Sequence, residues 1–131
     1  MMRRILIVDD EFSVRSLLRD VLELEDYDVA EAEDGPSALV AMAAQRPDLV
    51  LLDIMMPGMS GIDVLVRVRS DALLRDVPVV LLTAAGDDDT TWAGWTTGAS
   101  LYLNKPFDHL NLLEWIERLL AENSPALQSA S

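Results

Sequence analysis

Acidic, hydroxyl and ammonium side chains follow short apolar runs at four places in this sequence. Asp9 and Asp10 follow ILIV, Asp53 follows LVLL, Thr83 follows VVLL, and Lys105 follows LYLN. If these runs are parallel strands of one sheet, their carboxyl ends share an edge, and ligands of such sheets bind in the crevice there. Three carboxylates that meet at one point repel each other unless cations compensate them, and Lys105 supplies only one positive charge. The sequence therefore predicts a divalent cation, and Mg²⁺ suits a few carboxylates with free positions for water and phosphate.

The predicted cation site also indicates a reaction, because Asp53 would be a carboxylate nucleophile beside it. The cation and Lys105 would neutralise the oxygens of an incoming phosphoryl group, and the Thr83 hydroxyl would donate to one of them. Asp53 would then attack phosphorus and form an acyl phosphate, as aspartate does in ATPases. The sequence has no Gly-rich phosphate-binding loop and no nucleotide fingerprint. We therefore expect the phosphoryl donor to arrive on a partner or a small molecule.

Each of these residues also has an ordinary structural interpretation. An Asp after a strand often caps the next helix, and for Asp10 alone that interpretation is as good as metal binding. A single Thr after a strand usually belongs to a turn or cap, and a single Lys is usually a solvated charge. The functional interpretation depends on four strand ends carrying the whole set together. The functional interpretation is strongest for Asp53, because it precedes the loop MMPG at residues 55–58 and has no evident helix to cap.

The elements that must position these side chains alternate between strand and helix patterns. The predicted strands are 4–8, 28–32, 49–52, 77–82 and 101–103, and the predicted helices are 12–24, 36–45, 62–68, 88–97 and 109–122, the last with Asp108 as N-cap. The order (βα)₅ predicts an α/β fold, doubly wound, with a five-stranded parallel sheet covered on both faces. Strands 28–32 and 101–103 are mixed in polarity, as edge strands are, which favours the flavodoxin-like order 2-1-3-4-5.

Length, charge and composition exclude several classes of protein. The 131 residues fit one domain, which we place at 1–122, with 123–131 as a flexible tail or the start of a linker. The net charge of −13 argues against contact with nucleic acid or anionic membranes. The absence of cysteine excludes disulfides and thiolate sites. With no signal peptide and no apolar run long enough to cross a bilayer, we expect a cytoplasmic protein.

The sequence resembles the CheY-like receiver domains of two-component signalling. The segments that carry the resemblance are ILIVDDE at 5–11, the Asp34–Gly35 turn, DLVLLDIMMPGMSGIDVL at 48–65, PVVLLTA at 78–84 and GASLYLNKPF at 98–107. Together they span about residues 3–122. The resemblance implies that Asp53 accepts a phosphoryl group from the phosphohistidine of a sensor histidine kinase or a phosphotransfer protein. It also implies that the domain catalyses its own phosphorylation and dephosphorylation.

The resemblance assigns further roles around Asp53. Asp10, Asp53 and the backbone carbonyl of Met55 would hold Mg²⁺, with Asp9 beside the metal mainly through water. Thr83 and Lys105 would contact the phosphoryl oxygens, and Lys105–Pro106 would be a cis peptide.

The family also implies a switch. Thr83 would move toward the phosphoryl group and Tyr102 would turn from outside to inside, although an amphipathic edge residue is the simpler interpretation of Tyr102. The change would alter the surface of helix 88–97, strand 101–103 and helix 109–122. That surface would control an output partner or domain, and could form a homodimer.

Departures from the family pattern are modest. Trp92 and Trp95 stand where aliphatic residues are more usual, and their spacing favours inward packing on one helix face. Ser100 replaces a common acidic residue, so an ion-paired dimer would lack one charge. His109 falls in the first turn of the last helix, where we expect a surface residue.

Two other functions use similar residues. A phosphatase of the haloacid-dehalogenase type shares the sheet, Mg²⁺ and an aspartate nucleophile, but its nucleophile follows the first strand as Asp-x-Asp, whereas this chain has Asp9-Asp10-Glu11 and no cap segment. A receiver-like binding module without phosphorylation would lack Asp10, Asp53 or Lys105, and this sequence keeps all three.

Overall fold

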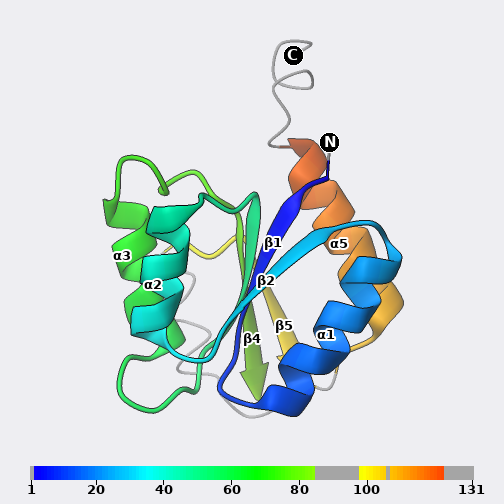
Figure 1. Cartoon of the computed structure of the whole chain (residues 1–131), viewed down its shortest axis with the longest axis horizontal. Coiled ribbons are helices and arrows are strands. Elements are labelled where there is room, and N and C mark those ends of the chain that lie inside the picture. Colours follow the sequence, from blue (N-terminus) through cyan, green and yellow to red (C-terminus); the bar gives the residue numbers. More distant parts are fainter. Residues whose placement is uncertain (1, 85–97, 106, 123–131) are drawn as a thin grey trace.

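The computed structural model describes residues 2–84, 98–105 and 107–122. Five strands form one parallel sheet in the order β2-β1-β3-β4-β5 (Figure 1), which confirms the predicted α/β fold and strand order. The strands are β1 (Arg4–Val8), β2 (Asp28–Ala32), β3 (Leu49–Asp53), β4 (Val79–Ala84) and β5 (Leu101–Lys105). The described helices are α1 (Phe12–Leu24), α2 (Gly35–Ala44), α3 (Gly61–Ser70) and α5 (His109–Glu122). The helix predicted at 88–97 lies outside the described residues.

Two helical layers cover the sheet, with α2 and α3 on one face and α1 and α5 on the other (Figure 1). Alternate residues of each central strand belong to different cores, because successive side chains of a strand point to opposite faces. On β1, Leu6 and Val8 pack with residues of α2 and α3, whereas Ile5 and Ile7 pack with residues of α1 and α5. Both faces of the central strands are therefore buried, which explains their continuous apolar runs. No helix in the described part of the chain is long and apolar enough to cross a membrane.

The strand boundaries differ from the predicted ones where the side-chain pattern and the backbone disagree. β4 begins at Val79 rather than Val77, because Pro78 has no N–H to donate to a neighbouring strand. β4 and β5 also run further than their apolar runs, with Thr83 paired to Asn104 at their shared edge. Backbone pairing thus continues through Thr83, Asn104 and Lys105. These polar residues therefore belong to the strands and not to the loops that follow them.

Helix starts follow local capping signals. Asp34 accepts a hydrogen bond from the Ser37 N–H at 2.8 Å, so α2 begins at Gly35, one residue before the predicted start. Asp108 accepts from the Leu110 N–H at 2.8 Å, as a capping residue for α5 does. Gly98 has φ +94°, the left-handed conformation expected for it.

Polar side chains tie the strands together at the amino edge of the sheet. The Arg69 guanidinium of α3 donates to the carbonyl oxygens of Gly98 at 2.9 Å, Arg75 at 3.0 Å and Val77 at 2.7 Å. The Ser100 hydroxyl accepts a hydrogen bond from the Val79 N–H at 3.1 Å. Ser100, which directly precedes β5, therefore binds the first residue of β4 within the domain.

Candidate functional site

Three carboxylates meet at the carboxyl edge of the sheet, where β1 and β3 lie side by side. Asp9 and Asp10 follow β1, and Asp53 is the last residue of β3. Each offers a carboxylate oxygen, and these oxygens all lie within 4.8 Å of one another. The Asp9 side chain is fully buried and Asp53 retains 4% of its surface, whereas Asp10 is exposed. The parallel pairing of β1 with β3 thus brings together acids that are 44 positions apart in the chain.

Lys105, the last residue of β5, reaches across the edge to two of these acids. Its Nζ lies 2.9 Å from Oδ2 of Asp9 and 3.4 Å from Oδ1 of Asp53. Burial acts against the ammonium charge, but the hydrogen bond and charges of the two carboxylates outweigh it, so the Lys105 pKa is raised. Lys105 is therefore charged, and it bridges the first and third strands of the chain.

The Asp53 carboxyl lies in an unfavourable electrostatic environment. Burial and the charge of Asp9 raise its pKa to about 6, although Lys105 and the Met55 N–H oppose the shift. One ammonium beside three carboxylates leaves negative charge without compensation. A divalent cation with oxygen ligands would supply it, and the donor set present fits Mg²⁺ in particular. The residues therefore suit the metal that the sequence predicts.

The Asp9 side chain stabilises the turn after β1, and Asp10 is not the N-cap residue of α1. The Glu11 N–H donates to Oδ1 of Asp9 at 2.9 Å. Glu11 occupies the N-cap position of α1 and makes no side-chain capping bond. The alternative interpretation of Asp10 as a helix cap is therefore wrong, because the helix starts after Glu11 and Asp9 binds the turn.

Thr83 is 1% exposed, and its hydroxyl donates to Oδ1 of Asn104 at 2.5 Å across β4 and β5. The register of the two strands places these residues opposite each other. Asn104 was missing from the predicted site, because it reads as one more polar residue at a strand end. The strand register could have identified Asn104. Side chains alternate between the two faces of a sheet, so once Thr83 and Asn104 are paired, their side chains lie on the same face.

The loop after β3 is shaped by a close approach of backbone to backbone. The Gly61 N–H donates to the Ile54 carbonyl at 2.9 Å, and a Cβ on Gly61 would collide with the Asp53 carbonyl oxygen. Glycine thus lets α3 begin against the end of β3. Met55, whose carbonyl is a predicted metal ligand, has an exposed side chain, and its N–H lies 3.4 Å from Oδ1 of Asp53.

Of the remaining predicted residues, the structure describes Tyr102 and His109, and the others lie outside the described residues. Tyr102 is half-buried and packs against the core beneath α2 and α3. His109 is exposed, as predicted, with its ring 6.4 Å from that of Phe107. Pro106 lies outside the described residues, so the predicted cis peptide stays a prediction. The predictions for Trp92 and Trp95 fall outside the described residues too.

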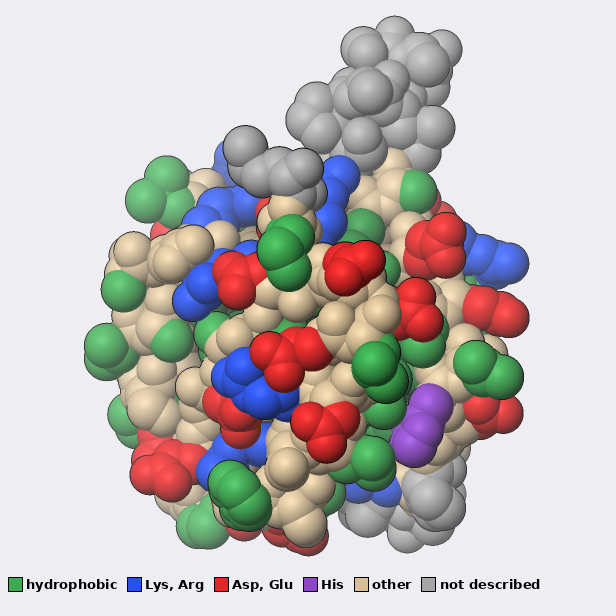
Figure 2. Space-filling view, turned by 45° about the vertical axis from the view of Figure 1, so that its right-hand side comes forward, with side chains coloured by type: hydrophobic (Ala, Val, Ile, Leu, Met, Phe, Trp, Pro, Cys, Tyr) green, Lys and Arg blue, Asp and Glu red, His purple; other side chains and the backbone are tan. Residues whose placement is uncertain are grey.

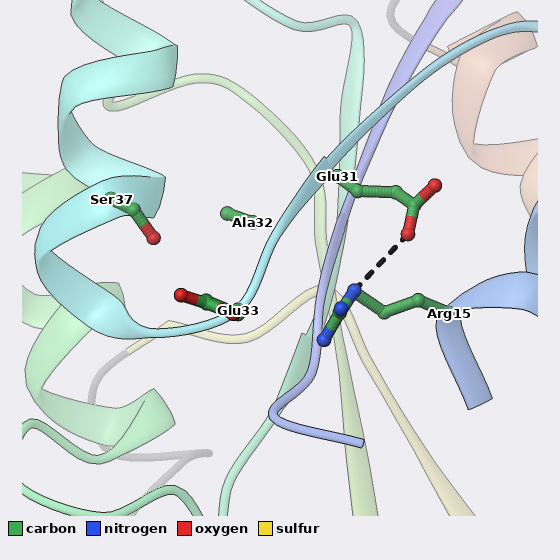
Figure 3. A pocket seen from close by; sticks show the side chains of 5 residues that line it. All are labelled: Arg15, Glu31, Ala32, Glu33 and Ser37. Atoms are coloured by element: carbon green, nitrogen blue, oxygen red, sulfur yellow. Dashed lines mark hydrogen bonds and ion pairs between the residues drawn. The ribbon is translucent and has the colours of Figure 1, made fainter. Parts of the chain in front are cut away.

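A shallow depression of about 400 Å³ lies beside β2 (Figure 3). The residues that line it are Arg15, Glu31, Ala32, Glu33 and Ser37. Figure 2 shows one face of the molecule, on which acidic side chains are spread widely with basic side chains among them. The acidic side chains on this face accord with the net charge of −13.

Comparisons with known proteins agree with this geometry. The family model for the response regulator receiver domain matches residues 5–117. The chain is 41% identical over 125 residues to the phosphate regulon transcriptional regulatory protein PhoB of Escherichia coli, covering 95% of this chain and 55% of PhoB. It is 44% identical over 123 residues to the DNA-binding response regulator MtrA of Mycobacterium leprae, covering 94% of this chain and 53% of MtrA. The chain thus spans about half the length of these relatives.

A solved structure has the same fold along its whole length. The putative response regulator from Chloroflexus aurantiacus superposes with a TM-score of 0.88 at 36% identity, covering 92% of this chain and 99% of that one.

Proposed function

Because this chain belongs to the receiver domains of response regulators, we propose that it accepts a phosphoryl group on Asp53 in a Mg²⁺-dependent reaction. The observation that carries the proposal is the position of the Lys105 ammonium between the carboxylates of Asp9 and Asp53. This arrangement supports the proposal, because it brings an ammonium group to within 3.4 Å of the proposed nucleophile, beside carboxylates that could bind a cation. The donor would be the phosphohistidine of a sensor histidine kinase or of a phosphotransfer protein.

Asp10, Asp53 and the Met55 carbonyl are the groups that would hold Mg²⁺, with Asp9 beside it. When bound, the cation neutralises phosphoryl oxygens and the carboxylates around it. The metal-ligand roles rest on the family resemblance and on the carboxylate oxygens, which lie within 4.8 Å of one another. The buried Asp9 carboxylate would keep its ion pair with Lys105.

In the transfer step, an oxygen of the Asp53 carboxylate forms a bond to phosphorus while the phosphorus–nitrogen bond of phosphohistidine breaks. The electron pair of that bond returns to the imidazole of the donor, which takes a proton from solvent. Lys105 and Thr83 contact the oxygens of the group in transfer and stabilise the charge there. Hydrolysis of the acyl phosphate by water then releases inorganic phosphate and returns Asp53 to its carboxylate, so the domain acts as a self-phosphorylating signalling switch and not as a phosphomonoesterase.

The same residues provide a route from the site to the surface. The Thr83 hydroxyl now donates to Asn104, so contact with a phosphoryl oxygen requires it to leave that partner. Asn104 lies on β5 beside Tyr102, whose turn inward would follow the movement of Thr83. The surface of β5 and α5 would change as a result, and it would control an output partner, an attached domain or a second copy of the chain.

The proposal also concerns the partner or attached domain that the receiver domain would control. PhoB is named a transcriptional regulatory protein and MtrA a DNA-binding response regulator, and each is about twice as long as the matched region. We assign residues 1–122 to the receiver domain and 123–131 to a tail or linker. The acidic receiver itself would not contact DNA or membrane, and it would act in the cytoplasm.

The proposal is tested by incubating the protein with acetyl phosphate and Mg²⁺ and measuring intact mass. We expect a gain of one phosphoryl group in the wild type and none in Asp53→Asn, or in the wild type with excess chelator. Asp20→Asn is the matched control, since it removes an exposed carboxylate on α1 and should be phosphorylated normally. A wild type that gains no mass, or an Asp53→Asn variant that gains it equally, would refute the assignment. Steady turnover of a phosphomonoester would instead indicate the phosphatase.

A further inference from the structure

Arg15 of α1 lies beside the acidic site and contacts its backbone. Its Nη1 donates to the carbonyl oxygen of Asp9 at 2.7 Å, and its Nε donates to Oε1 of Glu31 on β2 at 3.1 Å (Figure 3). We propose that Arg15, oriented by Glu31, is a positioning residue that holds the backbone after β1 so that Asp9 and Asp10 present their carboxylates to the cation. This inference rests on the proposed function of the site.

The turn after β1 needs such a contact because its own capping signals are weak. Glu11, at the N-cap of α1, makes no side-chain capping bond. The chain there is held through Asp9: its N–H donates to the Ala32 carbonyl at 3.2 Å, and Oδ1 accepts from the Glu11 N–H. The Asp9 carbonyl is the remaining polar group of the backbone at this position, and Arg15 satisfies it. Asp10 follows directly, so the orientation of its exposed carboxylate depends on this peptide.

Arg15 is itself restrained on two sides. Its side chain is only 12% exposed, and its guanidinium carbon lies 5.7 Å from the centre of the Phe12 ring. Glu31 is 24% exposed and accepts from Arg19 as well as from Arg15, so its carboxylate has little freedom. Glu31 balances the positive charge of Arg15, so electrostatic attraction between Arg15 and the carboxylates of the site is a minor effect. Arg15 acts on these carboxylates mainly by fixing the position of the Asp9 carbonyl.

The structure offers a matched control in Arg19. It also pairs with Glu31, at 2.5 Å, but its second contacts are Glu23 and the Val29 carbonyl and not Asp9. Arg15→Met and Arg19→Met therefore each remove one positive charge and one ion pair with Glu31. Only Arg15→Met removes the contact with the acidic site.

The test is the Mg²⁺ affinity of each variant, measured by titration calorimetry at a temperature where thermal unfolding shows all of them folded. We expect Arg15→Met to bind Mg²⁺ about tenfold more weakly than the wild type, the usual effect of removing a group that orients metal ligands. Arg19→Met should bind with wild-type affinity. Glu31→Ala should weaken binding and Glu31→Gln less so, because the amide oxygen still accepts from Arg15.

The outcomes separate the two proposals. If the wild type binds Mg²⁺ and Arg15→Met binds equally well, or if Arg15→Met and Arg19→Met lose affinity to the same extent, Arg15 has only a structural role and the inference is wrong. If the wild type binds no Mg²⁺, the proposed function fails and the inference with it. Should Arg15→Met not fold, Arg15→Lys replaces it. Lysine lacks the second nitrogen with which the guanidinium reaches the Asp9 carbonyl while Nε donates to Glu31. Weaker Mg²⁺ binding with retained folding therefore supports the inference, and unchanged binding overturns it.

Discussion

Replacing Asp53 by Asn should stabilise the metal-free protein at neutral pH, although it removes the proposed phosphoacceptor. The folded pKa of Asp53 is about 6, against an ordinary value of 3.8, because burial and the charge of Asp9 disfavour its ionised form. The folded state therefore binds the proton more tightly than the unfolded state, and stability falls as pH rises from about 4 to about 6. The difference corresponds to about 3 kcal/mol at pH 7, since each pKa unit is worth about 1.4 kcal/mol.

The pKa of about 6 already includes the attraction between Lys105 and the ionised Asp53 carboxylate. The gain is smaller than about 3 kcal/mol to the extent that the Asn amide packs and hydrogen-bonds less well than a protonated carboxyl group. We expect Asp53→Asn to raise the free energy of unfolding by about 2 kcal/mol at pH 7.5 in the presence of chelator, measured by urea denaturation. Near pH 4, where Asp53 is protonated in the folded wild type, the difference should vanish. Adding Mg²⁺ should stabilise the wild type and not the variant.

The control for Asp53→Asn is Asp20→Asn, which changes the net charge equally on an exposed face of α1. An Asp53→Asn variant that is less stable than the wild type at pH 7.5, or a difference that does not depend on pH, would refute the electrostatic reasoning.

Three further changes test other parts of the structure. Gly61→Ala should cost about 1–3 kcal/mol in urea denaturation, because the new Cβ would meet the Asp53 carbonyl, and an unchanged unfolding midpoint would contradict that close approach. Thr83→Val should slow phosphorylation by acetyl phosphate about 100-fold while the fold persists, and Thr83→Ser, which keeps the hydroxyl, should retain most of the rate. Glu31 has a pKa below its ordinary 4.5, chiefly through the hydrogen bond from Arg19, so it stabilises the fold above pH 4.5 and this contribution is lost as pH falls through its lower folded pKa. Urea titrations between pH 7 and pH 3 should therefore show a smaller acid loss in Glu31→Gln than in the wild type, and equal losses would count against the ion pair.

Much of the fold was predictable because the apolar pattern and the turn residues agree. Continuous apolar runs marked the strands buried on both faces, and Asp108 marked the start of the last helix, which the structure bears out. The strand ends were less predictable. Thr83 and Lys105 belong to strands whose backbone pairing continues after the apolar residues stop, and composition carries no signal for that.

The acidic cluster was predictable for a topological reason, and the contacts around it were not. Parallel strands end at one edge, so Asp9 and Asp53 had to meet once the strand order was known. The bonds of Asn104 and Arg15 depend instead on register and on side-chain reach. No motif in the sequence marks Arg15, and its contact with the Asp9 carbonyl is seen only in the folded structure.

The ion pair between Lys105 and Asp9 joins residues 96 positions apart, which has a consequence for protein synthesis. The amino-terminal strands leave the ribosome first, and they carry the acids without the ammonium that balances them. The centre is complete only when β5, an edge strand, adds to the sheet. A translation product that stops before β5 therefore carries the aspartates without the ammonium that pairs with them in the finished domain.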